Sequence, residues 1–337
     1  MDLLSNLALG FGTALTPAAL LYCFFGCVLG TLVGVLPAIG PAAVIAMLLP
    51  AAHAMPPAAS LMLMAGVYYG VQYSGSTAAI LANRPGSSSS VVTCIDGHQM
   101  ALQGRAGAAI AAAGIGSFFA GSVGTLIVAI CAYPVAVLAF QFGPAEYFSL
   151  MVAALVGVVV LASGPIAKAL AMVVLGLLLG LVGSDVATGL NRFTFGSPAL
   201  ADSSRFFAIL AMGVFAYGEV ISYLERPQPP RDVVAPIGKL LPTKDDIKAM
   251  TPAVLRGTVL GSVLGVLPGG GALLASIASH AIEKAMPIRG GEVDFGKGNI
   301  RSVAAPESAN NAGAQTSFIT LLTLGIPPNA VMGLMVG

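Results

Sequence analysis

The chain has 337 residues, of which 57% are apolar and only 9% are charged, and its mean hydropathy is +0.91. A soluble domain carries about 25% charged residues, so this composition excludes an ordinary cytosolic enzyme. No Asp, Glu, Lys or Arg lies between Asp2 and Arg84, or between Arg105 and Glu146. The sequence therefore predicts an all-α, polytopic membrane protein with about eight to ten passes of roughly 20 residues each.

The net charge of +1 provides no electrostatic field that would attract nucleic acid. No CxxC pair occurs among the four cysteines, which are Cys23, Cys27, Cys94 and Cys131. We interpret them as buried apolar residues. Each histidine stands alone, without a second ligand at metal-binding spacing. Structural or interfacial roles are therefore expected for His53, His98 and His280.

The first spanning segment, Pro17 to Leu36, runs into the sequence Gly34 to Pro41. The apolar stretch that follows, Ala42 to Leu49, is too short to span a bilayer. A half-length apolar segment beside Gly and Pro predicts a re-entrant hairpin. Further along, a polar patch at Tyr73 to Thr77 precedes a second expected helix break at Asn83 to Gly86.

The middle of the chain is plainer. We expect Ser87 to Arg105 to cross an aqueous face, and Ala106 to Phe140 to form one pass with a turn near Tyr133 and Pro134. Three more passes are predicted at Glu146 to Ala162, Ile166 to Gly183 and Phe206 to Leu224.

From Glu225 to Met250, Pro and charged residues replace the apolar run, and six of the fifteen basic residues lie between Glu225 and Arg256. The positive-inside rule places such a loop in the cytoplasm. We therefore expect residues 1–224 to hold a first repeat with scaffold helices, 225–251 a basic linker, and 252–337 a second repeat that is incomplete at its C-terminal end.

An internal repeat supports this division. Leu29 to Pro41 aligns without a gap to Leu260 to Ala272, and seven of thirteen positions are identical. The identities include one Pro and three Gly at the break. A weaker correspondence follows between Arg84-Pro-Gly86 and Ile326-Pro-Pro328, within the interruption Gly325 to Asn329.

Two copies of a helix, a Gly/Pro break, a short helix and a second break are typical of secondary transporters, whose sites lie where the broken helices meet. A break frees backbone N–H and C=O groups, each of which costs several kcal/mol in hydrocarbon unless it is satisfied. Half-helix N-termini attract carboxylates, whereas carbonyls and hydroxyls coordinate Na⁺. Whether the repeats are inverted or parallel depends on the number of passes between them.

Small oxygen-bearing side chains beside the breaks are the candidate ligands. Glu307, Asn310 and Asn311 fall at i, i+3 and i+4, so one helical face presents a carboxylate and two amides. In the first repeat the candidates are Ser74, Ser76, Thr77 and Asn83, and around the last break they are Thr323 and Asn329. Simple hydrogen bonding of Ser and Thr to the preceding helical turn is the alternative.

Other functional classes find less support. A membrane-embedded enzyme would need a nucleophile with a base, a metal set or paired acids within the spans, and the predicted spans contain almost no His, Asp or Glu. A channel would need a charged ring or a carbonyl filter, and neither pattern occurs. Transport fits the two polar helix breaks best.

At these motifs the sequence resembles the large membrane subunit of the tripartite tricarboxylate transporters, the TctA family. The matching stretches are Leu29 to Pro41, Tyr68 to Gly86, Gly104 to Gly121, Phe142 to Tyr147, Arg192 to Gly196, Arg256 to Ser276, and Phe295 through Asn311 to Pro327. The resemblance implies a permease of the bacterial inner membrane that imports tricarboxylates or related carboxylates. It also implies two partners, a periplasmic solute-binding protein and a small membrane subunit, and a Na⁺ or proton gradient in place of ATP.

The sequence departs from the family pattern at several positions, which are Ala38, Arg84, Ser87, Thr320 and Pro328. Arg84 would either add a partner for a carboxylate or obstruct ion coordination. Family members are also longer, which predicts that this chain lacks about its last third. A permease fragment without transport activity is therefore an alternative.

Together the repeat and the resemblance predict a substrate and ion site between the two Pro-containing breaks. In the first repeat the predicted site residues are Gly34, Pro37, Gly40, Gly75, Ser76, Thr77 and Asn83, and in the second they are Gly265, Pro268, Gly269, Gly271, Glu307, Asn310, Asn311, Thr323 and Pro327. Predicted ligands for Na⁺ are Ser76, Thr77, Asn310 and Asn311. Both Na⁺ and H⁺ stay open as the coupling ion, because Glu307 would suit a proton, and no other cofactor is expected.

Overall fold

A computed structural model describes residues 3–336 except 37–39, 140, 142, 162–164, 185–189, 203–205, 208, 211, 226–236, 268–270 and 289–291. The described chain is helical apart from one short hairpin, in which β1 (Gly183–Ser184) pairs antiparallel with β2 (Asn191–Arg192). The helices before this hairpin are α1 (Leu3–Ala14), α2 (Pro17–Val35), α3 (Pro41–Ala52), α4 (Pro57–Ala82), η1 (Ser88–Ser90), α5 (Thr93–Leu102), α6 (Ala106–Ala139), α7 (Pro144–Leu161) and α8 (Ile166–Gly180). Those after it are α9 (Pro198–Ala201), η2 (Met212–Tyr217), α11 (Gly218–Glu225), α12 (Lys244–Val266), α13 (Gly271–Ala285), α14 (Arg301–Leu324) and α15 (Ala330–Val336).

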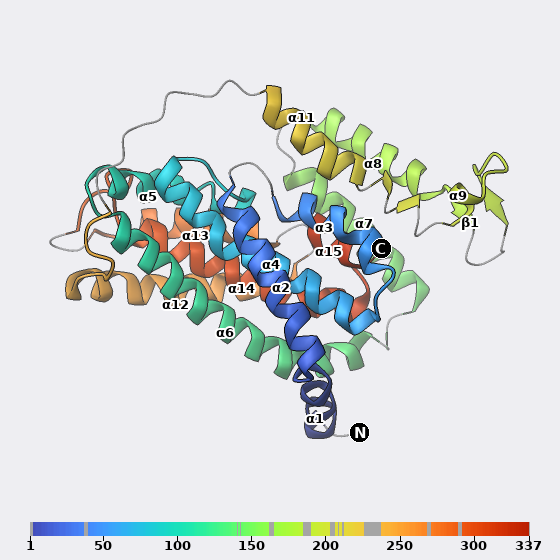
Figure 1. Ribbon diagram of the computed structural model, residues 1–337, viewed down its shortest axis with the longest axis horizontal. Coiled ribbons are helices and arrows are strands. Elements are labelled where there is room, and N and C mark those ends of the chain that lie inside the picture. Colours follow the sequence, from blue (N-terminus) through green and yellow to red (C-terminus); the bar gives the residue numbers. More distant parts are fainter. Residues whose placement is uncertain are drawn as a thin grey trace.

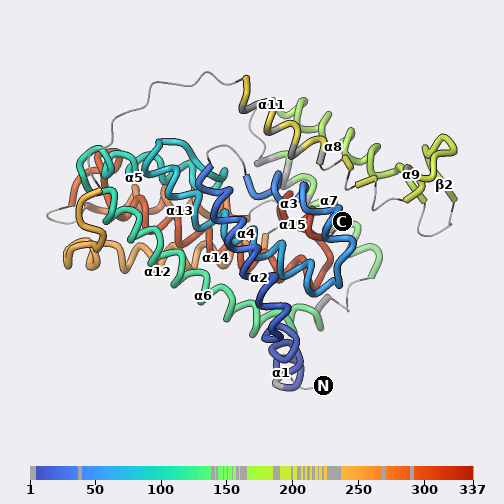
Figure 2. The backbone as a smooth tube through the Cα atoms, viewed as in Figure 1, coloured from blue at the N-terminus to red at the C-terminus, as the bar shows by residue number. Residues whose placement is uncertain are grey.

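Figure 1 shows α6, α12 and α14 beside one another along the long axis, with α5 toward one end and α3 and α15 toward the other. Figure 2 shows that α1 projects away from the body of the molecule. Among the described residues, three helices are long and apolar enough to cross a bilayer, and they are Pro17–Val35, Ala106–Val137 and Lys244–Val266. Together with the composition, these helices make the chain a membrane protein.

Two helix pairs form the body, and both are packed backbone to backbone at glycines. In the first pair, α2 lies against α4. A methyl group on Gly26 would lie 2.3 Å from the carbonyl oxygen of Leu63, and one on Gly30 would lie 2.2 Å from that of Val67. Gly34 meets Val71 one turn further on. The paired residue numbers rise together, so α2 and α4 run in the same direction.

The second pair, α12 and α14, repeats this packing. Three glycines of α12 align with those of α2 in the register of the sequence repeat, and Gly257, Gly261 and Gly265 meet Ala305, Ala309 and Gly313 of α14. A methyl group on Gly261 would lie 2.2 Å from the carbonyl oxygen of Ala309. The partner positions on α14 have the same spacing as those on α4, so the two pairs have corresponding contacts throughout.

A break and a short returning helix connect the members of each pair. The 12 residues of α3 rise about 18 Å and the 15 residues of α13 about 22 Å, both less than the roughly 30 Å of hydrocarbon. Both longer helices then end on a left-handed residue, Asn83 after α4 and Gly325 after α14, and these two residues occupy equivalent positions in the aligned pairs. The expected second breaks at both positions are confirmed.

The two pairs run in opposite directions. Near one end Gly97 lies against Ile80 of α4 and Val303 of α14, whereas further along the hydroxyl of Tyr69 donates to Oε1 of Gln315 at 2.7 Å. Residue numbers therefore fall along α14 as they rise along α4. An apolar cluster at the far end joins both pairs, and its members include Ile45, Val67, Tyr68, Ala272, Phe318 and Met332.

Several sequence-based boundaries are wrong. α6 continues to Ala139 through Pro134, where a turn was expected, because a long apolar helix tolerates a proline when other groups satisfy the freed carbonyl. α12 begins at Lys244, inside the expected linker, because Thr243 and Asp246 form a reciprocal N-terminal cap.

The predicted passes fit to different degrees. α7 and α8 lie close to the expected segments, although α8 ends at Gly180. The pass expected at 206–224 is helical at 206–207 and 209–210, and its described part continues with η2 and α11.

The glycine packing predicts that Gly261→Ala destabilises the protein by about 1 to 3 kcal/mol, because the new methyl group overlaps backbone that cannot move aside. Gly176→Ala is the matched control, since no atom lies within 4 Å of a methyl group at that position on α8. Thermal unfolding of the purified protein in detergent should show a lower melting temperature for Gly261→Ala alone. Equal melting temperatures for the two variants would contradict the packing described.

Candidate functional site

A buried polar cluster surrounds Glu307, whose side chain is 0% exposed. The hydroxyl of Thr93, at the start of α5, donates to Oε1 of Glu307, and Nδ2 of Asn310 donates to Oε2 at 3.1 Å. Nδ2 of Asn311 donates to the backbone oxygen of Glu307 at 2.9 Å and to Oγ of Ser117 on α6 at 2.8 Å. The prediction that one face of a helix presents Glu307, Asn310 and Asn311 is confirmed.

A second polar group, the serine turn, comprises Ser87 to Ser90. Oγ of Ser87 lies 2.9 Å from Oγ of Ser89 and 3.1 Å from Oγ of Ser90, and all three side chains are buried. The hydroxyl of Ser89 donates to Oε1 of Gln72 on α4 at 2.7 Å. The turn lies against α4, α13 and α14, so it is placed between the two helix pairs.

The two groups form one polar band across the molecule. Thr93 follows Ser90 by three residues, so the serine turn leads directly to the hydroxyl that binds Glu307. The band then passes through Asn310 and Asn311 to Ser117. The band presents hydroxyl, amide and carboxylate groups. Their oxygens suit coordination of Na⁺, and their N–H and O–H groups suit hydrogen bonds to a carboxylate substrate.

The break glycines of the first pair border this band. Gly86 packs against the carbonyl oxygen of Gly34 and the Cα atom of Gly75, and its backbone N–H donates to the oxygen of Gly75 at 3.3 Å. A methyl group on Gly75 would lie 3.1 Å from Oγ of Ser90. The structure therefore brings Gly34 and Gly75 together with the serine turn.

The corresponding glycine of the second pair, Gly265, lies beside Thr316 and Ser317 of α14. The hydroxyl of Ser317 donates to the oxygens of Gly265 and Gly313 at 3.0 and 2.7 Å. A methyl group on Gly265 would lie 2.2 Å from Oγ1 of Thr316.

Some predicted ligands bond within their own helix. The hydroxyl of Ser76 donates to the oxygen of Tyr73 at 2.9 Å, and that of Thr323 donates to the oxygen of Ile319 at 2.7 Å. The register between α4 and α14 places Ser76 near the height of Glu307, with Thr77 one residue further along.

The remaining predicted residues are distributed around the breaks. Asn83 is exposed at the end of α4, Gly40 caps α3, and Pro327 is exposed beyond α14. Gly271 starts α13 with a φ of +58° and lies beside the side chain of Asn329. Three residues lie outside the described part of the chain, and they are Pro37, Pro268 and Gly269.

The expectation that Ser87 to Arg105 crosses an aqueous face is wrong for most of its polar residues. The side chains of Ser87, Ser90, Thr93, Asp96 and His98 are all buried against the rest of the protein. Polar side chains fold inward here because they satisfy one another and neighbouring backbone groups. The run of four serines directly after the Arg84-Pro-Gly86 break was the signal that could have identified this part of the site.

Gln72 and Ser117 were also missed, because each is a single polar residue in an apolar run and only the fold brings it to the band. Two of the three histidines, His98 and His280, have structural partners, as expected. Nδ1 of His98 lies 3.0 Å from the oxygen of Ile80, and Nδ1 of His280 lies 2.9 Å from Oγ of Ser302. Within the described residues no group of three His, Cys, Asp or Glu could hold a metal ion.

Glu307 differs from two other buried acids, Asp246 and Glu283, in the charge of its partners. Asp246 pairs with Arg105 at 2.6 Å, and Glu283 pairs with Arg256 at 2.6 Å and Arg301 at 2.8 Å. Burial would raise the pKa of Glu283, but the hydrogen bonds and charges of the two arginines hold that pKa below its ordinary value. The hydrogen bonds of the Glu307 carboxylate in the described chain come instead from neutral groups, Thr93 and Asn310.

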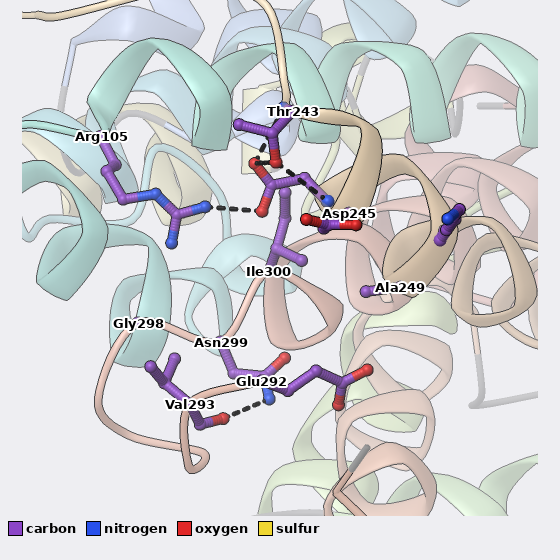
Figure 3. A pocket seen from close by; sticks show the side chains of 11 residues that line it. Arg105, Thr243, Asp245, Ala249, Glu292, Val293, Gly298, Asn299 and Ile300 are labelled. Carbon is purple, nitrogen blue, oxygen red and sulfur yellow. Dashed lines mark hydrogen bonds and ion pairs between the residues drawn. The ribbon is translucent and has the colours of Figure 1, made fainter. Parts of the chain in front are cut away.

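A pocket of about 610 Å³ lies away from the polar band, where the linker meets α12. Figure 3 shows Arg105 on one side of it, the start of α12 near Thr243 and Asp245 above, and the segment from Glu292 to Ile300 below. No predicted site residue lines this pocket. We call this end of the molecule the linker end.

The cluster predicts that Thr93→Val lowers the stability of the protein by about 1 to 3 kcal/mol, because the buried carboxyl of Glu307 loses a hydrogen-bond donor. Thr323→Val is the control, since its hydroxyl bonds only to the preceding turn of its own helix. Thermal unfolding in detergent tests both variants. A Thr93→Val variant as stable as Thr323→Val would show that this hydrogen bond is unimportant.

Three comparisons place the chain among known proteins. The model of a family described as the tripartite tricarboxylate transporter TctA family matches residues 20–337. An uncharacterized 52.8 kDa protein of Agrobacterium vitis, named for its position in the TAR-I ttuC′ 3′ region, is 55% identical over 337 residues, which are 100% of this chain and 66% of that protein. An uncharacterized protein of the TAR-II ttuC′ 3′ region of the same organism is 64% identical over 77 residues, 23% of this chain and 31% of its own length. No solved structure matches.

Proposed function

Because the chain belongs to the tripartite tricarboxylate transporter TctA family, which is a family of transporters and not of enzymes, we propose that it forms the large permease subunit of an ion-driven carboxylate importer. The observation that carries this proposal is the polar band between two oppositely directed helix pairs, each interrupted by a glycine-containing break. Polar groups inside a membrane cost several kcal/mol each unless they are hydrogen-bonded, and ionisable residues there usually mark a functional site.

The two helix pairs are inverted repeats in this proposal. α2 to α4 and α12 to α14 have matching glycine contacts, matching short helices and matching left-handed ends, and the two pairs run in opposite directions. Inverted repeats of this kind allow alternating access, because the two halves can exchange conformations around a fixed central site. The short helices α3 and α13 re-enter the membrane and return part of the way.

Substrate and coupling ion bind along the polar band. The amides of Asn310 and Asn311, together with the serine turn, supply donors that fit the oxygens of a carboxylate. Glu307 supplies a negative charge that suits a bound cation or a proton, which compensates the charge of the substrate during transport. Ser76 and Thr77 border the band from α4 and complete the predicted Na⁺ ligands.

The family description also supports partners. A tripartite system has three components, and we assign to this chain the membrane component that receives the carboxylate from a periplasmic solute-binding protein and works beside a small membrane subunit. The basic residues near the linker end support a cytoplasmic position for that end, and we assign the protein to the bacterial inner membrane. The chain spans 66% of the length of its 55% identical relative, so transport is proposed for the complete permease.

Uptake measurements test the proposal. Vesicles that contain the full-length permease with its small subunit and solute-binding protein should accumulate radiolabelled citrate or a related carboxylate under an imposed Na⁺ or pH gradient. Glu307→Gln and Asn311→Ala should each reduce uptake about tenfold or more, because a lost charge-assisted or buried hydrogen bond costs about 1.5 to 3 kcal/mol.

The matched control is Ser122→Ala on α6, whose hydroxyl bonds to its own helix at the oxygen of Phe118 at 2.8 Å. This variant should transport like the unmodified protein. Absence of carboxylate uptake under either gradient, with both membrane subunits inserted and the solute-binding protein supplied, would exclude the proposed function. Normal uptake by both Glu307→Gln and Asn311→Ala would move the site away from the polar band.

A further inference from the structure

We call the chain before the linker the first half and the chain after it the second half. At the linker end, a carboxylate of the first half binds a loop of the second half. We call residues 292–300, which lead into α14, the strap. Oδ1 of Asp96 on α5 accepts hydrogen bonds from the backbone N–H groups of Gly296, Gly298 and Asn299 at 2.8, 2.8 and 2.9 Å. Gly296 and Gly298 have φ values of +86° and +96°, which L side chains rarely adopt, so the strap is shaped by glycine to surround this oxygen.

Two more contacts join the same regions. Nε2 of Gln103 donates to the backbone oxygen of Lys297 at 2.9 Å, and Met100 packs against Gly298. Nearby, Nη2 of Arg105 lies 2.6 Å from Oδ1 of Asp246 at the start of α12. Residues in and next to α5 therefore contact the second half through hydrogen bonds and an ion pair. We call the hydrogen bonds of Asp96 and Gln103 to the strap the clasp.

The strap is equally well fixed to its own half. Arg301 bonds to Glu283 at 2.8 Å, to Glu292 at 3.0 Å and to the backbone oxygen of Pro287 at 3.2 Å, and its guanidinium lies 5.5 Å from the centre of the Phe295 ring. These bonds all lie within the segment from α13 to the start of α14. The strap would therefore move together with the second half as a preformed unit.

The contacts between the halves differ at the two ends. Away from the linker end the halves meet through the polar band, through the hydrogen bond of Tyr69 to Gln315, and at the far end through an apolar cluster that includes Phe318. At the linker end the clasp borders the pocket of Figure 3, whose lining includes Gly298 and Asn299. Polar groups that separate beside water exchange one set of hydrogen bonds for another, so such contacts can open and close repeatedly.

The hydrogen bonds of Asp96 indicate that its carboxylate is buried in order to bind the strap. The side chain is 0% exposed, and its second oxygen, Oδ2, has no hydrogen-bond partner among the described residues. The three N–H groups of the strap are the hydrogen bonds that the structure gives this carboxylate. If the strap departs, water must reach Asp96, because an unsolvated carboxylate would be far too costly.

From this geometry we propose that the clasp is the gate at the linker end: it is closed in this structure and opens once in each transport cycle, when the strap leaves Asp96. The inference rests on the proposed transport function. It assigns to Asp96 and Gln103 a role in conformational change and none in binding substrate.

Cross-linking tests the gate directly. In a chain whose four cysteines are replaced by alanine, Gln103→Cys and Lys297→Cys are introduced together and bridged with a short bis-maleimide in the assembled transporter. Both side chains are at the surface, so the variant should fold, and it should transport before bridging. Bridging should reduce uptake at least tenfold. Unchanged uptake through the bridge would overturn the proposal.

The matched control bridges Asp294→Cys to Lys297→Cys, two surface positions within the strap whose native side chains pair at 2.8 Å. This bridge joins no residue of α5, so uptake should stay within about twofold of the unbridged variant. Equal loss of uptake from both bridges would overturn the gate, because the loss would then come from stiffening the strap alone.

A second measurement needs no transport. Met100→Cys is buried beside Gly298, so a water-soluble maleimide should label it only while the clasp is open. Asp96→Asn should speed this labelling about tenfold or more, and the bridge between positions 103 and 297 should slow it by a similar factor. Identical rates in all three proteins would overturn the gate. Absent uptake with these expected rates would instead count against the transport function alone.

Discussion

Close contact between the backbones of neighbouring helices is the constraint on which this structure depends. Gly30 and Gly261 leave no room for even a methyl group against α4 and α14. Helices in lipid gain little from apolar burial, so such close approach supplies much of the attraction that holds them together. The same contacts recur in the same register in both halves, so both helix pairs are packed in the same way.

The opposite directions of the two pairs then place the polar groups. Tyr69 of α4 bonds to Gln315 of α14, and the serine turn contacts both helices. Glu307 ends up with neutral partners, whereas Asp246 and Glu283 at the linker end are paired with arginines. The division separates the polar band, which we propose as the binding region, from a charged region at the linker end.

The sequence was informative where a physical rule acts locally. Gly/Pro breaks and the i, i+3, i+4 spacing of Glu307 predicted the helix ends and the polar face of α14 correctly. It failed where the fold overrides local preference. Pro134 does not end α6, and the polar segment after Ser87 is buried, because partners distant in sequence satisfy it. Asp96 could not be assigned, since its hydrogen-bond donors lie in the distant second half of the chain.

The most direct test of this account is the position of a bound carboxylate in an experimental structure of the complete permease. The account predicts that the ligand lies between α4 and α14, within hydrogen-bonding distance of the serine turn and of Asn310 or Asn311, with Glu307 beside it. A carboxylate bound instead in the pocket between Arg105 and Asn299, with the polar band unchanged and unoccupied, would contradict the central claim.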